Sequence, residues 1–191
     1  MTSEKKNKYR IEKDSLGDVK VPSEKLWGAQ TQRSLQNFRI GNDLIPPEFI
    51  KAFAMQKKAA AVSNIAINQL DSKIGSKIIK VCDLIIKGNM LDQFPLSVWQ
   101  TGSGTQTNMN VNEVIANKAN QELGKPLGEY EPVHPNDHCN MSQSSNDSFP
   151  TAMHISIVLE TNEKLFPSIN NMIKILKKKI NHFEKIIKIG R

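Results

Sequence analysis

Cysteine is nearly absent from this chain, with only Cys82 and Cys139 in 191 residues. One lies in an apolar pattern of helical spacing and the other in a polar stretch, so the disulfide framework of a secreted protein is not indicated. No apolar run is long enough to span a bilayer, and the charged start MTSEKKNKYR has no apolar stretch behind it. We therefore expect reduced thiols and a soluble, cytoplasmic protein without a membrane segment.

Aromatic residues are also few, at 6%, whereas the formal net charge is +7. The excess lysines gather at the two ends, in Lys5 to Lys8 and in Lys174 to Lys188, where they read as solvated helix faces. No aromatic RNA-binding motif, zinc-finger spacing or basic zipper accompanies them, so nucleic-acid binding is not expected. A mild positive field would favour a small anionic ligand.

The spacing of apolar residues predicts a mainly helical chain after an irregular start. The first forty-odd residues read as short extended pieces around 9–12 and 19–22, with turns at Gly17 and Gly41. One helix is expected from Pro46 and Pro47 to about Gln69. A second, capped by Asp71 or Ser72, ends at Gly88, and a third stops near Gly124, followed by a loop over 125–148.

A long apolar stripe then begins at Pro150 and runs at helical spacing to Ile187, with Pro167 expected to kink or break it. The earlier helices are too few and too short to cover this stripe fully. We expect partner helices from other subunits or from a further C-terminal part.

The segment WQTGSGTQTNMNVN, from Trp99 to Asn112, is the first candidate binding feature. Gly102 and Gly104 let the backbone approach a ligand closely, and the helix that follows presents free N–H groups and the positive end of its dipole. Hydroxyl and amide side chains in the segment add neutral donors. An ordinary capping loop is the alternative for any single segment of this kind.

A second donor-rich segment, HPNDHCNMSQSSND, lies directly before the long stripe. Its hydroxyls and amides stand at a helix entrance, where Asp147 or Ser148 suits the N-cap position with Pro150 just inside. Capping alone remains the alternative for Asp147 and Ser148. Two such entrances could converge on one dicarboxylate, and neutral donors would leave the bound anion reactive.

Three stretches together resemble the class II fumarate hydratases of the fumarase/aspartase superfamily. They are VPSEKLWGAQTQRSLQNFRIG (Val21 to Gly41), TGSGTQTNMNVNEV (Thr101 to Val114) and SQSSND (Ser142 to Asp147). The motifs GSGTQ and SQSSND of this chain differ from the motifs GAGTS and SQSTND that are usual in aspartases. The resemblance implies a mainly α fold, with an α-rich N-terminal domain over 1–143 followed, over 144–191, by the first helices of a long-helix central bundle.

Carried over by position, the resemblance implies a substrate-binding set and a separate outer anion site. The substrate-binding set is Ser103, Gly104, Thr105, Asn108, Ser144, Ser145 and Asn146. The outer site is His134, Pro135, Asn136 and Asp137, where Glu131 and Met141 depart from the residues of some members, so weak anion binding is expected. A metal site built from His134, Asp137, His138 and Cys139 lacks a standard zinc spacing, and no metal or cofactor is expected.

The activity implied by the resemblance is the reversible hydration of fumarate to L-malate in the tricarboxylic acid cycle, by a homotetramer. No catalytic acid or base is expected within this chain, because the family's Thr-His pair would follow Gly190-Arg191. The 191 residues would then form the N-terminal part of a subunit and be inactive alone. The alternatives are an aspartase-type ammonia-lyase, a dicarboxylate-binding module without catalysis, and a purely structural helical protein.

Overall fold

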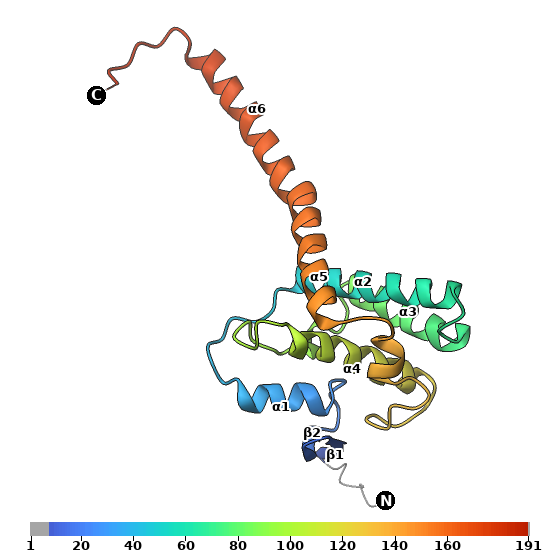
Figure 1. Cartoon of the computed structure of the whole chain (residues 1–191). Helices are drawn as coiled ribbons and strands as arrows, with labels where there is room; N and C mark the ends of the chain where they lie inside the picture. The colour runs from blue at the N-terminus through green and yellow to red at the C-terminus, as the bar shows by residue number, and fades with distance from the viewer. Residues whose placement is uncertain (1–7, 191) are drawn as a thin grey trace, which may run out of the picture.

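Helices dominate the computed structural model, which describes residues 8–190 (Figure 1). The fold is therefore mainly α, as the sequence predicts. In chain order the elements are β1 (Tyr9–Asp14), β2 (Gly17–Pro22), α1 (Ala29–Asn37), α2 (Pro47–Ala66), α3 (Ser72–Ile86), a 3-10 turn (Leu91–Gln93), α4 (Thr105–Glu122), a π-helical turn (Pro135–Cys139), α5 (Ser145–Glu160), a π-helical segment (Thr161–Leu165) and α6 (Phe166–Phe183).

Helices α2, α3 and α4 form the body, and their local sequence explains where they start and stop. Pro46 and Pro47 open α2. The Asp71 carboxylate caps α3 by accepting from the backbone N–H of Ile74 (3.1 Å), and Gly88 ends it with a φ of 89°. Apolar side chains of the three helices form the core, among them Phe53, Ile78, Val81, Ile85, Val111, Val114 and Ile115. The predicted helices are confirmed here to within a few residues.

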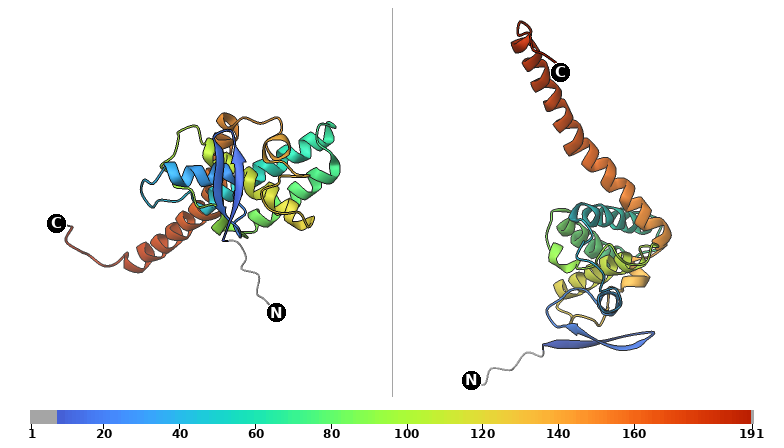
Figure 2. Two further views of the ribbon diagram at one scale, coloured as in Figure 1. Left: turned by 90° about the horizontal axis from the view of Figure 1, so that it is seen from below. Right: turned by 90° about the vertical axis from the view of Figure 1, so that its left-hand side faces the viewer.

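The two predicted extended pieces form an antiparallel hairpin, with Tyr9 opposite Pro22 and Asp14 opposite Gly17. It lies at one end of the body, while α6 leaves from the other (Figure 2). Arg33 of α1 binds the hairpin turn, since its Nη2 donates to Asp14 Oδ1 (2.8 Å) and to the Gly17 carbonyl (2.7 Å).

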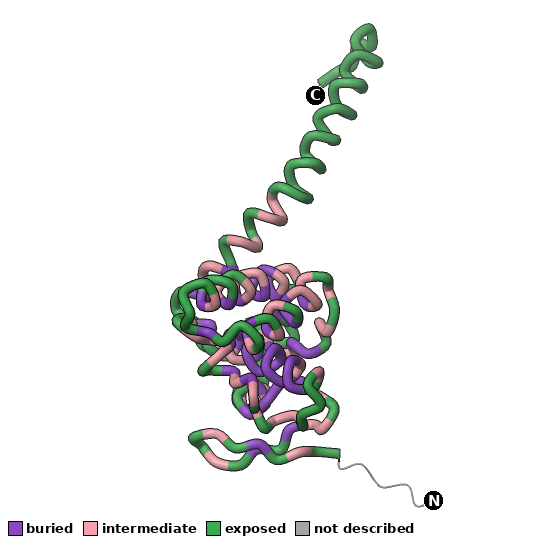
Figure 3. Tube along the Cα trace, turned by 90° about the vertical axis from the view of Figure 1, so that its right-hand side faces the viewer, coloured by how far each residue is buried: buried purple, intermediate pink, exposed green. Residues whose placement is uncertain are grey.

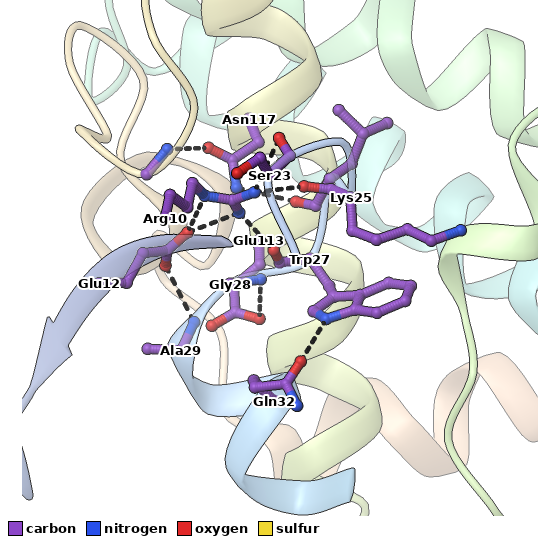
Figure 4. Close-up of polar contacts among 12 residues, drawn as sticks. Arg10, Glu12, Ser23, Lys25, Trp27, Gly28, Ala29, Gln32, Glu113 and Asn117 are labelled. Carbon is purple, nitrogen blue, oxygen red and sulfur yellow. Dashed lines mark hydrogen bonds and ion pairs between the residues drawn. The ribbon is translucent and has the colours of Figure 1, made fainter. Parts of the chain in front are cut away.

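Residues 29–37 form α1, so the expectation of irregular chain was wrong there. The N-cap residue, Gly28, offers no side chain, and the carboxylate of Glu113 on α4 takes over the capping (Figure 4). Glu113 accepts from the backbone N–H groups of Gly28 (2.9 Å) and Gln30 (2.8 Å) and from the Thr31 hydroxyl (2.6 Å). A cap that comes from a distant helix leaves no local signal, which is why the sequence pattern missed α1.

Arg10 holds the chain that leads into α1 (Figure 4). Its guanidinium donates to the carbonyls of Pro22 (2.9 Å), Lys25 (2.7 Å) and Trp27 (2.7 Å). Glu12 lies beside it and accepts from the backbone N–H of Ala29 at 2.9 Å. A Cβ on Gly28 would lie 1.8 Å from the Tyr130 hydroxyl, so glycine is the residue that fits between these groups.

Helix α5 begins earlier than predicted. Its N-cap is Ser144, whose hydroxyl accepts from the backbone N–H of Asn146 at 3.3 Å. Asp147 and Ser148 therefore lie in the first turn, and assigning the cap to either was wrong; Pro150 lies inside the helix instead of at its start. Serine caps at least as well as aspartate, and several capping residues in a row leave the choice to packing.

The helical stretch that carries the long stripe continues through Pro167 without a break. The π-helical segment 161–165 runs directly into α6, and Pro167 is the second residue of α6. The helix therefore departs from α geometry in the turn that the proline ring would crowd. Helix α6 ends at Phe183, four residues before Ile187. No helix within residues 8–190 has the length and apolarity needed to cross a membrane.

Every residue of α6 is exposed, including its apolar ones (Figure 3). The apolar set is Phe166, Ile169, Met172, Ile173, Ile175, Leu176, Ile180 and Phe183. This confirms that the helices within residues 8–190 do not cover the stripe fully. The C-terminal lysines are exposed as predicted, although the helix face that was expected to carry them stops at Phe183. Of the N-terminal lysines, Lys8 is exposed and precedes β1 instead of lying in a helix, and Lys5 and Lys6 lie outside the described residues.

Candidate anion-binding site

The loop before α4 turns at Gly104, whose φ of 68° is the left-handed conformation that favours glycine. A Cβ there would lie 2.2 Å from the ring of Phe149 on α5, so the close approach is to a packed aromatic side chain. Nothing lies within 4 Å of a Cβ built on Gly102. The two glycines of the motif therefore differ, and Gly104 alone is required by its backbone and its neighbour.

Four hydroxyls form a continuous chain of contacts at the start of α4. The oxygens of Thr101 and Ser103, of Ser103 and Thr105, and of Thr105 and Ser145 each lie 3.1 Å apart. Ser145 opens α5, so the last of these contacts joins the two donor-rich segments across forty residues of sequence. The two segments therefore lie side by side, whereas their convergence on one dicarboxylate stays a prediction. We call Thr101, Ser103, Thr105 and Ser145 the hydroxyl cluster.

Both helix starts beside the hydroxyl cluster leave donors for a ligand. Gly104, the N-cap residue of α4, has no side chain that could accept a hydrogen bond, and of the first-turn amides that of Thr107 donates to Gln100 Oε1 at 3.1 Å. At α5 the Ser144 oxygen accepts one backbone N–H, and its own O–H stays available to donate. Asn146 is exposed next to it. Two positive helix ends and several neutral O–H groups thus meet at one exposed place, which suits a small anion.

Asn108, also expected to bind substrate, lies elsewhere. Its side chain is 2% exposed, and its Nδ2 donates to Asn140 Oδ1 at 3.0 Å. Its Oδ1 is buried without a partner in the structure. The structure therefore places Asn108 behind the hydroxyl cluster and not within it.

A buried lysine that was not predicted as a site residue binds the same Asn140 oxygen as Asn108. Lys57 of α2 is 1% exposed, and its Nζ lies 3.0 Å from Asn140 Oδ1 and 2.9 Å from Gln143 Oε1. Burial lowers the pKa of Lys57 to about 7. The available signal was a lysine inside the alanine-rich apolar pattern of α2. We call the buried Lys57, Asn108 and Asn112, together with the half-buried Asn140 and Gln143, the buried polar layer.

The expected outer site forms a single π-helical turn capped by His134. Its Nδ1 accepts from the backbone N–H groups of Asn136 (3.3 Å) and Asp137 (3.2 Å), so both amides are already bonded. His138 Nδ1 accepts from the His134 N–H at 2.8 Å, and burial lowers the pKa of His138. Pro135 is buried beneath the turn. Over residues 8–190 no group of three or more His, Cys, Asp or Glu side chains gathers as metal ligands would.

An apolar hollow of about 380 Å³ adjoins the hydroxyl cluster. Phe49, Phe149 and Met153 line it, and Thr101 and Gly102 form its edge. Because apolar walls offer a dianion no hydrogen bonds, an anionic ligand would bind at the hydroxyl cluster and not in the hollow.

Comparison with known proteins agrees with this fold. A family described as lyase matches residues 17–191. The chain is 55% identical over 183 residues to the class II fumarate hydratase of Helicobacter pylori (strain J99 / ATCC 700824), covering 96% of this chain and 40% of that protein. It is 55% identical over 186 residues to the mitochondrial fumarate hydratase of Rhizopus oryzae, covering 96% of this chain and 37% of that protein.

Solved structures give the same result. A class II fumarase from Schistosoma mansoni superposes with a TM-score of 0.91 at 47% identity, over 96% of this chain and 39% of that one. A fumarate lyase:delta crystallin from Brucella melitensis superposes with a TM-score of 0.92 at 42% identity, over 96% and 43%. The resemblance expected from the sequence motifs is confirmed, and the chain spans about 40% of the length of the curated relatives it matches.

Proposed function

The chain belongs to this lyase family, and on that premise we propose that it supplies the substrate-holding part of a class II fumarate hydratase, which interconverts fumarate and L-malate. The observation that carries the proposal is the 3.1 Å contact between the hydroxyls of Thr105 and Ser145, because it joins the two donor-rich segments at one place. The curated relatives named as fumarate hydratases, at 55% identity, supply the reaction.

The dicarboxylate is held between two helix starts. Ser103, Gly104 and Thr105 at α4 bind one carboxylate, and Ser144, Ser145 and Asn146 at α5 bind the substrate from the other side. A fumarate or malate dianion gains charge-assisted hydrogen bonds from O–H and N–H groups at both places. Asn108 supports this arrangement from the buried polar layer.

Neutral donors suit the chemistry of the hydration. In the dehydration direction a base removes a proton from the carbon beside a carboxylate, and negative charge accumulates on that carboxylate before hydroxide leaves. Fixed O–H and N–H groups stabilise this added charge without taking the proton themselves. We assign the proton transfers to groups outside this chain, and the reaction needs no metal or organic cofactor in this scheme.

The proposal extends to the assembly, the outer anion site and the location of the protein. The uncovered stripe of α5 and α6 packs in a helical bundle of a homotetramer, begun here by residues 144–191 after an N-terminal domain over 1–143. The turn at 134–137 is a weak outer anion site, since two of its amides already bind His134. The protein works in the cytoplasm, in the tricarboxylic acid cycle.

Substitution of the two bridging hydroxyls tests the proposal. In the assembled protein, Thr105→Val and Ser145→Ala each lower kcat/KM for fumarate by about 10² to 10³, the usual effect of losing one donor to a developing anion. Loss of fumarate absorbance measures the rate. Ser76→Ala is the matched control, because this α3 hydroxyl is exposed and bonds only within its own helix.

Several results would contradict the proposal. Unchanged turnover in both variants would remove the hydroxyl cluster from catalysis, and ammonia release from aspartate would indicate an aspartase instead. Ligand binding without turnover by the assembled protein would indicate a binding module. The 191-residue chain alone is expected to show no turnover.

A further inference from the structure

Lys57 and Lys58 are neighbours on α2 with opposite surroundings. The Lys58 side chain is 39% exposed and pairs with the Asp83 carboxylate of α3 at 2.7 Å. Lys57 is 1% exposed, and the two oxygens that it binds belong to neutral amides, those of Asn140 and Gln143. Burying a cation with neutral partners is costly, so a buried lysine of this kind calls for a reason beyond packing.

The contacts of Lys57 lead to both donor-rich segments. Asn140 Oδ1, which Lys57 binds, also accepts from the side-chain amides of Asn108 (3.0 Å) and Asn112 (3.2 Å) on α4. Gln143, the second acceptor, directly precedes the Ser144 cap of α5. One ammonium group therefore ties the first turns of α4 to the chain that enters α5.

The positive charge of Lys57 is not neutralised by its surroundings. The titratable groups that act on it are the thiols of Cys82 on α3 and Cys139 in the π-helical turn. Burial raises the pKa of Cys139 to about 12 and that of Cys82 further, so both thiols are uncharged near neutral pH. The ring of Phe53 lies 5.5 Å away as a neutral neighbour.

We infer that Lys57 is a positioning residue for the anion site: through Asn140 and Gln143 it fixes the two donor-rich segments relative to each other, and its charge lies behind them to favour a bound dicarboxylate. This inference rests on the proposed function and deepens it. It assigns the cation of an otherwise neutral site to a side chain that never touches the substrate.

The charge gives Lys57 a signature that a structural residue lacks. Its pKa near 7 means that the free site loses its cation as the pH rises through neutrality. A bound dianion favours the protonated form, so binding takes up a proton above that pH. In the pH range where the bound protein holds one proton more than the free protein, the affinity for the dianion should therefore fall about tenfold for each unit by which the pH rises.

The test compares Lys57→Met with Lys58→Met in the assembled protein. Titration calorimetry with a pre-equilibrated mixture of fumarate and L-malate, in which no net turnover occurs, from pH 6 to about 9, gives the affinity and, from buffers of different ionisation enthalpy, the proton uptake. We expect Lys57→Met to weaken binding about tenfold at pH 6 and to abolish both the pH dependence and the uptake. Lys58→Met keeps both, and Lys57→Arg retains most of the affinity without the pH dependence.

Hydrogen exchange gives a second measurement that needs no ligand. Lys57→Met increases amide exchange over residues 140–148, and Lys58→Met does not. If Lys57→Met fails to fold, the pH dependence of the wild-type affinity still decides, since a flat profile overturns the inference. Failure of the wild type to bind either acid refutes the proposed function. In that case, unchanged amide exchange over residues 140–148 in Lys57→Met overturns the positioning role of Lys57 as well. Wild-type binding with an unchanged Lys57→Met affinity overturns the inference alone.

Discussion

Gly104 allows a prediction whose size follows from the structure. An alanine there must adopt a φ of 68°, which costs about 1 to 2 kcal/mol for a residue with a Cβ. Its Cβ would also lie 2.2 Å from the ring of Phe149, and relieving such a contact in a packed region costs about 1 to 3 kcal/mol more. Gly104→Ala should therefore destabilise the protein by about 2 to 5 kcal/mol.

Phe149 transmits the change further. Its ring packs 4.8 Å from that of Phe49 and 6.3 Å from that of Phe53, centroid to centroid. Phe149 also lines the apolar hollow, so its ring can move into that space only at the expense of these ring contacts, and part of the strain falls on the Gly104 loop. The contact between the Thr105 and Ser145 hydroxyls should lengthen, and fumarate binding should weaken along with stability.

Gly102→Ala is the matched control, two residues away in the same loop. A Cβ there meets nothing within 4 Å and needs no left-handed backbone. Its stability should equal that of the wild type or exceed it by up to about 1 kcal/mol, because alanine restricts the unfolded chain. Thermal unfolding followed by circular dichroism measures both variants, with a fall of about 2 to 4 °C in Tm expected per kcal/mol lost. Equal stability of the two variants would refute this reasoning.

Three other outcomes are expected. Burial raises the pKa of Glu113 from 4.5 to about 7. Between pH 4.5 and about 7 the folded protein therefore holds a proton that the unfolded chain has lost, and the free energy of unfolding falls as the pH rises through this range. Glu113→Gln should remove this pH dependence of stability, measured by urea unfolding. The Arg33 guanidinium lowers the pKa of Asp14 below 3.8. The stability that this ion pair contributes is present above that pH and is lost as the pH falls through the pKa of the folded state. Arg33→Leu should therefore weaken the fall in unfolding free energy at acid pH. Ile173→Lys with Ile180→Lys should leave the unfolding of the body unchanged, since both side chains are exposed, but reduce self-association in sedimentation.

The elements that the sequence predicted well are those whose signals are local. Helix α3 carries its own cap at Asp71 and its own stop at Gly88, and its apolar residues repeat at helical spacing. The start of α5 was harder, because SSNDS offers several capping side chains in a row and packing selects Ser144. Helix α1 was missed altogether, since its cap is Glu113, 85 residues from Gly28 in sequence.

The candidate site divides in the same way. The convergence of the two donor-rich segments was predictable from their matching composition and from the family resemblance. The place of Asn108 was not, because whether an amide on α4 faces solvent or Asn140 depends on how α4 packs against the loop before α5. The burial of Lys57 left only a weak signal, a lysine inside an alanine-rich apolar pattern, because an exposed helix face can carry the same residues.

The distant cap of α1 also bears on the order of folding. Helices α2 and α3 are sequence neighbours joined by a short turn, so their contacts close small loops and can form early. The cap of α1 requires closure of a loop of 85 residues, and a nine-residue helix is marginal by itself. Helix α1 therefore gains its structure only once α4 is in place, and the hairpin that Arg33 holds to it is expected to join last.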